Sequence, residues 1–256
     1  MRELVARQKL GQHFLSSGKI LDRIARAACG EGTPLAVEIG SGKGALTEHL
    51  LSHAARVVAI ELDAALAQYL RERWPDEPRL EIVETNALEA NWSAWGEGML
   101  AGNLPYCVAT ALIARYVRNP GLLRQAVFLI QKEVAERVTA QPGTRDYGYL
   151  SVECQFLARA EYLFTVAPGA FRPPPKVDSA AIRLTPYREA PTVDPDRFLK
   201  FVSACFRQKR KTLRNNLAGH YARDPLDSLP EMGLRAEQLS VAGFIALYRV
   251  LEGSGS

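Results

Sequence analysis

The chain has 256 residues, 47% of them hydrophobic, which suits one large domain or one domain with a small appendage. No apolar segment approaches the roughly 20 residues that span a bilayer, and residues 1–9 lack the apolar core of a signal peptide. We therefore expect a cytoplasmic protein that does not associate with membranes. The net charge of +4 excludes little by itself, but the charges are unevenly distributed.

The cysteines and histidines do not form a metal-binding pattern. The four cysteines lie far apart and include no C-x-x-C pair, so neither a zinc ribbon nor a disulfide framework is indicated. His49 and His53 are four residues apart on a predicted helix, but the glutamate of an H-E-x-x-H motif is missing. We predict no metal site.

A short apolar run, Leu35–Ile39, is followed by the glycine-rich segment Gly40–Gly44 and then by a helical pattern. Glycines let the backbone approach a ligand, and the start of the helix offers exposed N–H groups. A second apolar run, Val57–Ile60, ends at Glu61, 21 residues beyond Gly40. At this spacing a doubly wound sheet places an acid on a ribose. A third run ends near Asn86, whose amide could meet an adenine edge.

The glycine spacing distinguishes two cofactor classes. A dinucleotide site has G-x-G-x-x-G, whereas this chain has G-x-G-x-G preceded by Glu38, an acid poorly placed for a phosphate. The pattern therefore favours S-adenosylmethionine, whose amino acid part is zwitterionic, over a nicotinamide cofactor. The alternative is a glycine-rich turn that only connects a strand to a helix.

The segment Gly102–Tyr106 follows the apolar run Met99–Ala101. The side-chain oxygen of Asn103 and the carbonyl of Leu104, which precedes a proline, could accept both N–H groups of an aryl amine and localise its lone pair for attack. Tyr106 would stack on the ring. Taken alone, the same residues also fit an ordinary turn at the end of a strand.

Periodicity predicts the remaining elements of an α/β domain over residues 1–186. A basic arm, residues 1–18, precedes a helix that contains Ile20, Leu21 and Ile24. We predict helices at Ala109–Tyr116, Glu133–Thr139 and Leu150–Leu157, strands at Ala126–Gln131, Tyr162–Val166 and Ala180–Leu184, and a mobile loop at Gln141–Gly148 that could close over a substrate.

Three consecutive prolines follow Phe171 and Arg172, and we expect a stiff polyproline segment there. Such a segment could hold Phe171 across a cleft from Tyr106. The alternative is a rigid strand connection with Phe171 in the core.

The composition changes after Pro186, and residues 187–252 are predicted to form a small helical domain followed by a disordered tail, residues 253–256. No acid occurs between Arg197 and Arg223, an interval that favours contact with nucleic acid phosphates. We predict that a basic helix carries the RNA-binding residues Arg207, Lys209, Arg210, Lys211 and Arg214.

Seven motifs together resemble, in order and spacing, those of the ribosomal RNA adenine dimethyltransferases, most closely the bacterial small-subunit dimethyladenosine transferases. The resemblance covers about Lys9 to Leu251. The motifs are Gly11–Leu15, Glu38–Thr47, Ile60–Asp63, Asn103–Tyr106, Gln131–Arg137, Phe171–Ser179 and Arg210–Leu213.

This resemblance implies a Rossmann-like S-adenosylmethionine-dependent methyltransferase domain with a small all-helical C-terminal domain. It also implies an enzyme that dimethylates two adjacent adenosines in the 3′-terminal hairpin loop of 16S rRNA, within the small ribosomal subunit, late in assembly. Separately from the resemblance, we expect a monomer. The donor would be S-adenosylmethionine, with no metal.

The resemblance also implies residue roles. Cofactor contacts would come from His13, Leu15, Gly40, Gly42, Glu61, Asn86 and Asn103, with Glu61 on the ribose and Asn86 on the adenine. Asn103, Leu104, Pro105 and Tyr106 would orient the target amine, and Phe171 and Tyr106 would sandwich a flipped-out adenine.

Two residues depart from the family pattern, which usually has Asn in place of His13 and Asp in place of Asn86. An Asn oxygen still accepts from an adenine amine, although the hydrogen bond is weaker than one to a carboxylate. The predicted mechanism is direct attack by the adenosine N6 on a sulfonium methyl, without a general base. The alternatives are an enzyme of the resistance type that methylates large-subunit rRNA, and an inactive RNA-binding assembly factor.

Overall fold

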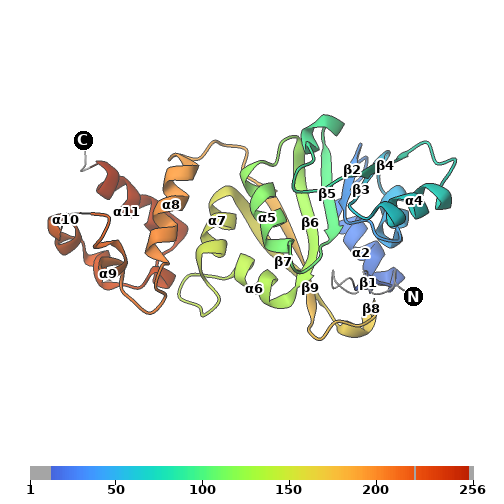
Figure 1. Cartoon of the computed structure of the whole chain (residues 1–256). Coiled ribbons are helices and arrows are strands. Elements are labelled where there is room, and N and C mark those ends of the chain that lie inside the picture. Colours follow the sequence, from blue (N-terminus) through green and yellow to red (C-terminus); the bar gives the residue numbers. More distant parts are fainter. Residues whose placement is uncertain (1–12, 222, 254–256) are drawn as a thin grey trace. The chain divides into compact units, whose positions relative to one another are not determined.

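The computed structural model describes residues 13–221 and 223–253 (Figure 1). The chain divides into two compact units, Met1–Ala135 with Arg159–Pro186 and Glu136–Ala158 with Tyr187–Ser256. Residues 136–158 therefore group with the C-terminal part and not with the N-terminal domain to which their sequence position assigned them. The reason is packing, since Tyr147 and Phe156 belong to the same buried cluster as Phe198.

In the described part of the first unit, a seven-stranded sheet has the order β4-β3-β2-β5-β6-β9-β7. β2 pairs in parallel with β3 and β5, and β4 and β6 extend the parallel part outward, whereas β9 runs antiparallel to β6. Parallel strands place their carboxyl ends at one edge of the sheet, where an open α/β fold binds ligands. The strands are β2 (Ala36–Ile39), β3 (Val57–Glu61), β4 (Leu80–Glu84), β5 (Gly98–Asn103), β6 (Leu123–Gln131), β7 (Ala158–Val166) and β9 (Ser179–Pro186).

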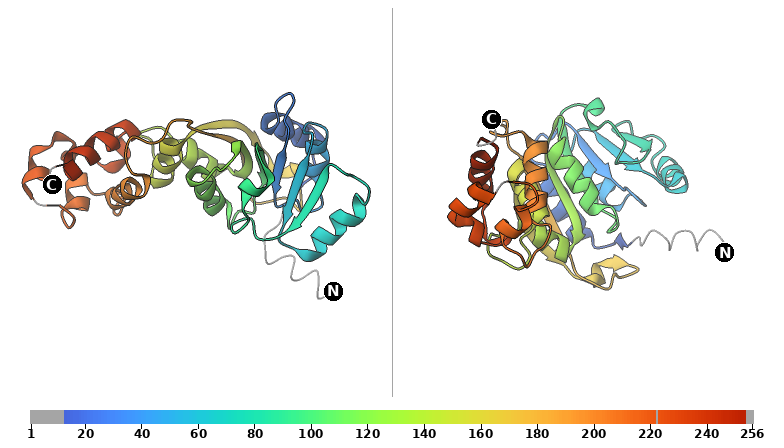
Figure 2. Two further views of the ribbon diagram at one scale, coloured as in Figure 1. Left: turned by 90° about the horizontal axis from the view of Figure 1, so that it is seen from above. Right: turned by 60° about the vertical axis from the view of Figure 1, so that its left-hand side comes forward.

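Helices cover both faces of this sheet (Figures 1 and 2). Val127 and Leu129 of β6 belong to the cluster that contains α2 and α3, whereas the intervening Phe128 packs edge-to-face on Tyr116 of α5, with ring centroids 6.1 Å apart. Alternate residues of a strand point to opposite faces, so these helices lie on opposite sides. The helices are α2 (Gly18–Ala28), α3 (Ala45–Leu51), α4 (Ala64–Arg73) and α5 (Ala109–Arg118).

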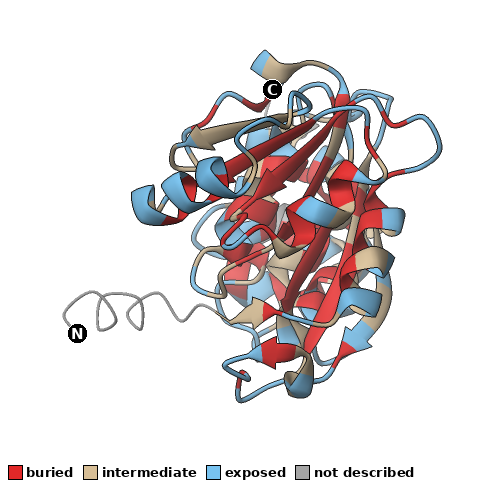
Figure 3. Cartoon of the chain, turned by 90° about the vertical axis from the view of Figure 1, so that its right-hand side faces the viewer, coloured by how far each residue is buried: buried red, intermediate tan, exposed pale blue. Residues whose placement is uncertain are grey.

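The core of the first unit is made by the sheet. All residues of β2 and β3 are buried, as expected for parallel strands covered on both faces. Figure 3 shows this, with the strands largely red and the outer helix surfaces pale blue. Apart from α4, which was not predicted, the sequence indicated each of these strands and helices to within a few residues, and the Rossmann-like α/β fold is confirmed.

A two-stranded ribbon was not predicted. β1 (Phe14–Leu15), in the expected basic arm, pairs antiparallel with β8 (Phe171–Arg172), which follows a 3₁₀ turn at Pro168–Ala170. The earlier part of the arm, residues 1–12, and residues 254–256 of the expected tail lie outside the described residues. Within the described ranges, no helix has the length and apolar character needed to cross a bilayer.

The second unit is mainly helical, as predicted, and its core is aromatic. Phe198 of α8 packs against Phe156 of α7 and Tyr248 of α11 at centroid distances of 4.4 and 5.6 Å. Tyr147, in the loop that was expected to be mobile, is fully buried in this core. The helices are α6 (Lys132–Thr139), which begins in the first unit, α7 (Tyr149–Leu157), α8 (Pro195–Cys205), α9 (Leu213–Leu217), α10 (Arg223–Ser228) and α11 (Val241–Gly253).

Candidate active site and nucleic-acid interface

A cavity of about 300 Å³ lies at the carboxyl ends of β2, β3, β4 and β5. Of the seven residues predicted to bind the cofactor, Gly40, Glu61 and Asn86 line it. Its volume is at the lower end of the range for small-molecule sites. Apolar walls from Leu62, Leu88 and Leu112 complete it. These three leucines were not predicted as site residues, because nothing in their spacing identifies them as lining a cavity.

The glycine loop lies directly against the Asn103 motif. Gly40 has φ of 71°, in the left-handed region that favours glycine, and a Cβ added there would sit 3.9 Å from the carbonyl oxygen of Asn103 and from Pro105. The strand ends β2 and β5 therefore bring the two predicted motifs, separated by over 60 residues in sequence, to adjoining positions.

The Glu61 carboxylate, only 4% exposed, is held by three backbone N–H groups. Gly42 donates to Oε2 at 2.7 Å, and Leu62 and Asp63 donate to Oε1 at 2.9 and 3.0 Å. Gly42, predicted to touch a cofactor, therefore acts here by orienting Glu61. A carboxylate has about four lone-pair sites, so one remains to accept a hydroxyl from a ligand in the cavity.

Asn86 has a fixed amide orientation. Its Nδ2 donates to Glu89 at 2.7 Å and its Oδ1 accepts from the N–H of Leu88 at 3.0 Å. Since an amide oxygen has two lone pairs, one is left to accept an N–H. Arg115 of α5 clamps this loop, because its guanidinium donates to the carbonyls of Ala87 and Ala90. No motif in the sequence signals that clamp.

Glu38 is buried away from the cavity. It is 1% exposed and accepts a hydrogen bond from the Thr47 hydroxyl at 2.5 Å. Burial, with a smaller contribution from the nearby Glu61, raises its pKa to about 8. Burial therefore favours the protonated form of the acid before the glycine loop.

Asn103 ends β5 and its side chain is oriented by the main chain of the N-terminal segment. Its Nδ2 donates to the carbonyl of His13 at 3.1 Å. The side-chain oxygen therefore faces the other way, and among the described residues we find no donor to it. An acceptor is thus available at the position where the motif predicts one.

The Leu104 carbonyl provides a second acceptor. The backbone N–H of Leu104 donates to the Leu129 carbonyl of the neighbouring strand at 3.0 Å. This hydrogen bond holds the backbone of Leu104 in place. Pro105 has no N–H, and in the described chain no backbone N–H donates to the Leu104 oxygen. The Pro105 carbonyl, in contrast, accepts from Val108 and Ala109, the residues that begin α5.

The ring of Tyr106 is held at its hydroxyl end. Its oxygen lies 2.8 Å from Oγ of Ser179, a 1% exposed residue at the start of β9. Burial raises the pKa of Tyr106, so its phenol stays neutral. Ser179 belongs to a motif quoted above, but no pattern in the sequence pairs it with Tyr106.

His13 does not line the cavity but lies beside Tyr106, with ring centroids 5.9 Å apart. Its Nδ1 donates to the carbonyl of Pro173 at 2.8 Å. The hydrogen bond from Asn103 goes to the backbone carbonyl of His13. It therefore does not depend on whether position 13 carries His, as here, or Asn, as is usual in the family.

Two predicted site residues are buried in the core. Leu15 and Phe171 pair across the β1–β8 ribbon, and their side chains are 4% and 1% exposed in the cluster that contains α2. Phe171 therefore offers no ring face for a base, and a sandwich with Tyr106 is not formed in this conformation. The alternative considered from sequence, Phe171 in the core, describes the structure.

The five predicted RNA-binding residues are exposed, but most of them are not on a helix. α8 ends at Cys205 and α9 starts at Leu213, so the basic segment 206–212 is a loop. The buried side chain of Asn216 fixes this loop, since it donates to the carbonyls of Cys205 and Gln208 and accepts from the N–H of Gln208. Periodicity alone could not reveal this tertiary contact.

The five basic residues fall into two groups, those with a hydrogen-bond or ion-pair partner in the protein and those without an ion pair among the described residues. Lys209 donates to the Arg145 carbonyl at 2.5 Å, and Arg214 pairs with Asp227 at 2.6 Å. For the side chains of Arg207, Arg210 and Lys211 we find no ion pair within the described residues. These three cations are the most available for an anionic ligand.

No group of three or more His, Cys, Asp or Glu side chains is arranged to hold a metal in the part of the chain that the structure describes. His53, one of the two histidines considered above, contacts Asp22 at 3.1 Å.

A family model described as ribosomal RNA adenine dimethylase matches residues 4–252. The chain is 44% identical to the ribosomal RNA small subunit methyltransferase A of Acidobacterium capsulatum, with 95% of this chain and 90% of that protein covered. It is 41% identical to the protein of the same name from Pseudomonas putida, with 94% and 93% covered.

Two solved structures share the fold over nearly the whole chain. A dimethyladenosine transferase from Plasmodium falciparum has a TM-score of 0.82 and 25% identity, covering 95% of this chain and 98% of its own. The 23S rRNA methyltransferase ErmE has a TM-score of 0.70 and 28% identity, covering 93% and 99%.

Proposed function

Because this chain belongs to the ribosomal RNA adenine dimethylase family, we propose that it transfers methyl groups from S-adenosylmethionine to N6 of two adjacent adenosines of 16S rRNA. We further propose that these adenosines lie in the hairpin loop near the 3′ end and are modified late in small-subunit assembly. The observation that carries the proposal is the orientation of Asn103, whose amide N–H is used by His13 and whose oxygen is left as an acceptor.

The cavity residues fit the donor. Glu61 retains a lone pair for a ribose hydroxyl, Asn86 retains one for the adenine amine, and Gly40 admits the methionine part close to the backbone. When bound, S-adenosylmethionine supplies an electrophilic methyl group. The apolar walls and a 4% exposed carboxylate provide the mixture of surfaces that an adenosine needs.

At the target base, the protein contributes orientation. Asn103 Oδ1 and the Leu104 carbonyl accept the two N–H groups of the adenosine amine, which directs its lone pair away from the ring. Tyr106 stacks on the base, as suits recognition of an unpaired nucleotide. No side chain is assigned as a general base, since the methylated amine is acidic enough to lose its proton to water.

The small-subunit assignment has an alternative in the large-subunit enzymes, one of which shares the fold. The relatives named small subunit methyltransferase A, at 40% identity and above over most of the chain, favour the small subunit. The basic loop after α8 is the surface we assign to rRNA.

The test measures labelled methyl transfer from S-adenosylmethionine to undermethylated small and large subunits, with nuclease digestion to identify the nucleoside. We expect dimethyladenosine in 16S rRNA with the wild type and none with Asn103→Ala. Methylated adenosine found only in large-subunit rRNA would assign the protein to the large-subunit methyltransferases. RNA binding without transfer by the wild type would indicate an assembly factor and contradict the proposal.

A further inference from the structure

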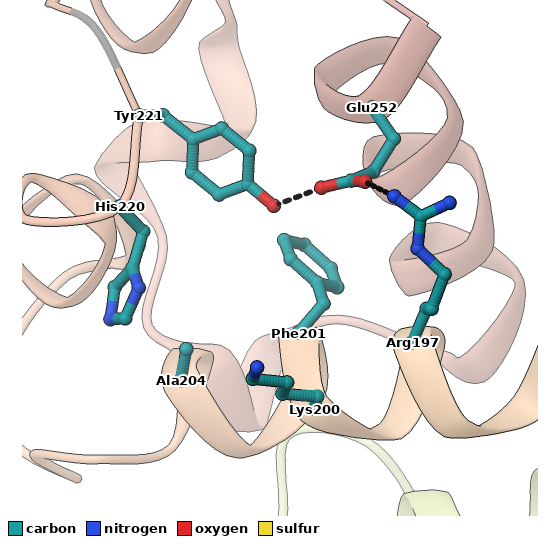
Figure 4. Close-up of a pocket in the computed structure, with 7 residues that line it drawn as sticks. All are labelled: Arg197, Lys200, Phe201, Ala204, His220, Tyr221 and Glu252. Atoms are coloured by element: carbon teal, nitrogen blue, oxygen red, sulfur yellow. Dashed lines mark hydrogen bonds and ion pairs between the residues drawn. The ribbon is translucent and has the colours of Figure 1, made fainter. Parts of the chain in front are cut away.

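The second unit contains a pocket of about 320 Å³ that the proposed reaction does not use. Arg197, Lys200, Phe201 and Ala204 of α8 line one side, at the i, i+3, i+4, i+7 spacing that puts residues on one helix face. The segment after α9 and the last turns of α11 complete the pocket (Figure 4).

The floor of the pocket is aromatic. Phe201 is 5% exposed and meets Tyr221 edge-to-face, with ring centroids 6.4 Å apart and planes at 77°. Behind it, Tyr248 supports Phe201 at 5.5 Å. Because the two ring planes are nearly perpendicular and Phe201 is almost wholly buried, the partly exposed ring of Tyr221 is the apolar contact that the pocket offers to a planar ligand.

The acid in the pocket is already neutralised. Glu252 accepts a hydrogen bond from the Tyr221 hydroxyl at 2.8 Å through one oxygen and from Arg197 at 3.1 Å through the other. Burial and the contact with Glu252 raise the pKa of Tyr221, so the phenol remains a donor. This chain of contacts runs across one side of the opening in Figure 4.

The uncompensated charge is on the other side. Figure 4 shows Lys200 and His220 flanking Ala204, whose short side chain leaves the space between them open. For the side chains of Lys200 and His220 we find no hydrogen bond or ion pair within the described ranges. An ammonium and an imidazole beside an aromatic floor are complementary to a phosphate attached to a planar base.

We infer that this pocket binds one unpaired nucleotide of the RNA substrate, with its base against the Tyr221 ring and its phosphate at Lys200 and His220. The inference rests on the proposed function, since it adds a second RNA contact to the same enzyme. Position supports RNA as the occupant, because α8 leads from Ala204 directly into the basic loop that starts at Arg207. The strand that contacts the loop can thus continue into the pocket.

Binding of undermethylated small-subunit rRNA to the full chain, without the methyl donor, tests the inference. Lys200→Ala should weaken binding about fivefold to tenfold. Arg188→Ala, which removes another exposed cation of the same unit outside the pocket, should change binding less than twofold. Equal effects of the two variants would overturn the inference, because they would show general charge attraction only.

Ala204→Leu fills the space without changing charge and should weaken binding by about tenfold. Matching far-ultraviolet circular dichroism and urea midpoints would show that the variant is folded. Ultraviolet crosslinking with peptide mapping should place a nucleotide on Phe201 or Tyr221. Crosslinks elsewhere on the chain but none on these rings would overturn the inference.

A free nucleotide is the other source of the same chemistry. If adenosine 5′-monophosphate binds and Lys200→Ala abolishes that binding without altering RNA affinity, the pocket serves a mononucleotide and the inference is wrong. Because these assays omit methyl transfer, they succeed or fail independently of the Asn103→Ala result.

Discussion

The amide nitrogen of Asn103 donates to the main-chain carbonyl of His13 at 3.1 Å, across 90 residues of sequence. This hydrogen bond sets the orientation of the Asn103 side-chain amide, so the orientation depends on the fold. It ties the first described residues to the end of β5, and it leaves the amide oxygen for the target amine. Asn is the side chain that can donate at one end and accept at the other.

Asn103→Asp should separate these two roles, because a carboxylate accepts but cannot donate to His13. We expect methyl transfer to fall about 100-fold through misplacement of the acceptor, while the affinity for rRNA stays unchanged. Single-turnover methyl transfer and equilibrium RNA binding measure the two quantities. Asn91→Asp, the same change at an exposed helix cap of the first unit, is the control and should retain full activity.

Tyr106 and Ser179 should be energetically coupled, since their hydroxyls lie 2.8 Å apart and Ser179 is buried. Tyr106→Phe and Ser179→Ala should each lower the free energy of unfolding by about 1 kcal/mol. The double variant should lose less than the sum of the two. Urea unfolding of the four proteins measures the coupling, and strictly additive losses would show that the contact contributes nothing.

Two substitutions of Tyr106 distinguish the contribution of ring stacking from that of the hydroxyl hydrogen bond. Tyr106→Phe keeps the ring, so methyl transfer should fall only a few-fold, whereas Tyr106→Ala removes the stacking surface and should reduce transfer far more. Equal activity of the Phe and Ala variants would remove Tyr106 from base recognition.

Glu38 should make the stability of the protein depend on pH. Its pKa is about 8 in the folded protein, against 4.5 when exposed. Between these values the folded protein keeps a proton that the unfolded chain releases. The stabilising contribution is complete below the unfolded pKa and is lost as pH rises through the folded pKa, by up to about 1.4 kcal/mol per pH unit.

Glu38→Gln keeps an acceptor for Thr47 and cannot titrate. Urea unfolding at intervals from pH 5 to 8 should therefore give a shallower decline for this variant than for the wild type. Glu31→Gln, at an exposed position, should leave the wild-type slope unchanged. If Glu38→Gln and the wild type have parallel slopes, the carboxyl is ionised in the folded state.

Short sequence patterns correctly predicted the features that depend on neighbouring residues, such as strands and glycine turns. The apolar runs of β2 and β3 are strands because both faces are covered, and Gly40 is needed where φ is 71°. The position of Glu61 at the end of its strand follows from parallel topology. These features place three predicted residues around one cavity.

The predictions that were wrong concern contacts distant in sequence. Phe171 is buried because β8 pairs with β1, a contact that no periodicity of two-residue strands can reveal. The basic run is a loop because one buried side chain, Asn216, satisfies its backbone. The contact between buried Glu38 and Thr47 was not predicted at all, because it depends on helix packing over the sheet.

The salt dependence of RNA binding should identify which cations contact phosphates. Arg207, Arg210 and Lys211 have no ion pair among the described residues, whereas Lys209 is engaged with Arg145 and Glu237. Replacing the first three with Ala should reduce the slope of log K against log salt by about two units, since each phosphate contact contributes roughly 0.7 to 0.9. Filter binding between low and moderate salt measures it.

Lys209→Ala serves as the matched control and should change the slope by less than one unit, because this lysine already donates within the protein. An unchanged slope in the triple variant would remove the loop from the RNA interface. If the triple variant has a reduced slope but unchanged methyl transfer at saturating RNA, the loop acts in binding alone. This outcome is expected because Asn103, Leu104 and Tyr106 act on the base after it is bound.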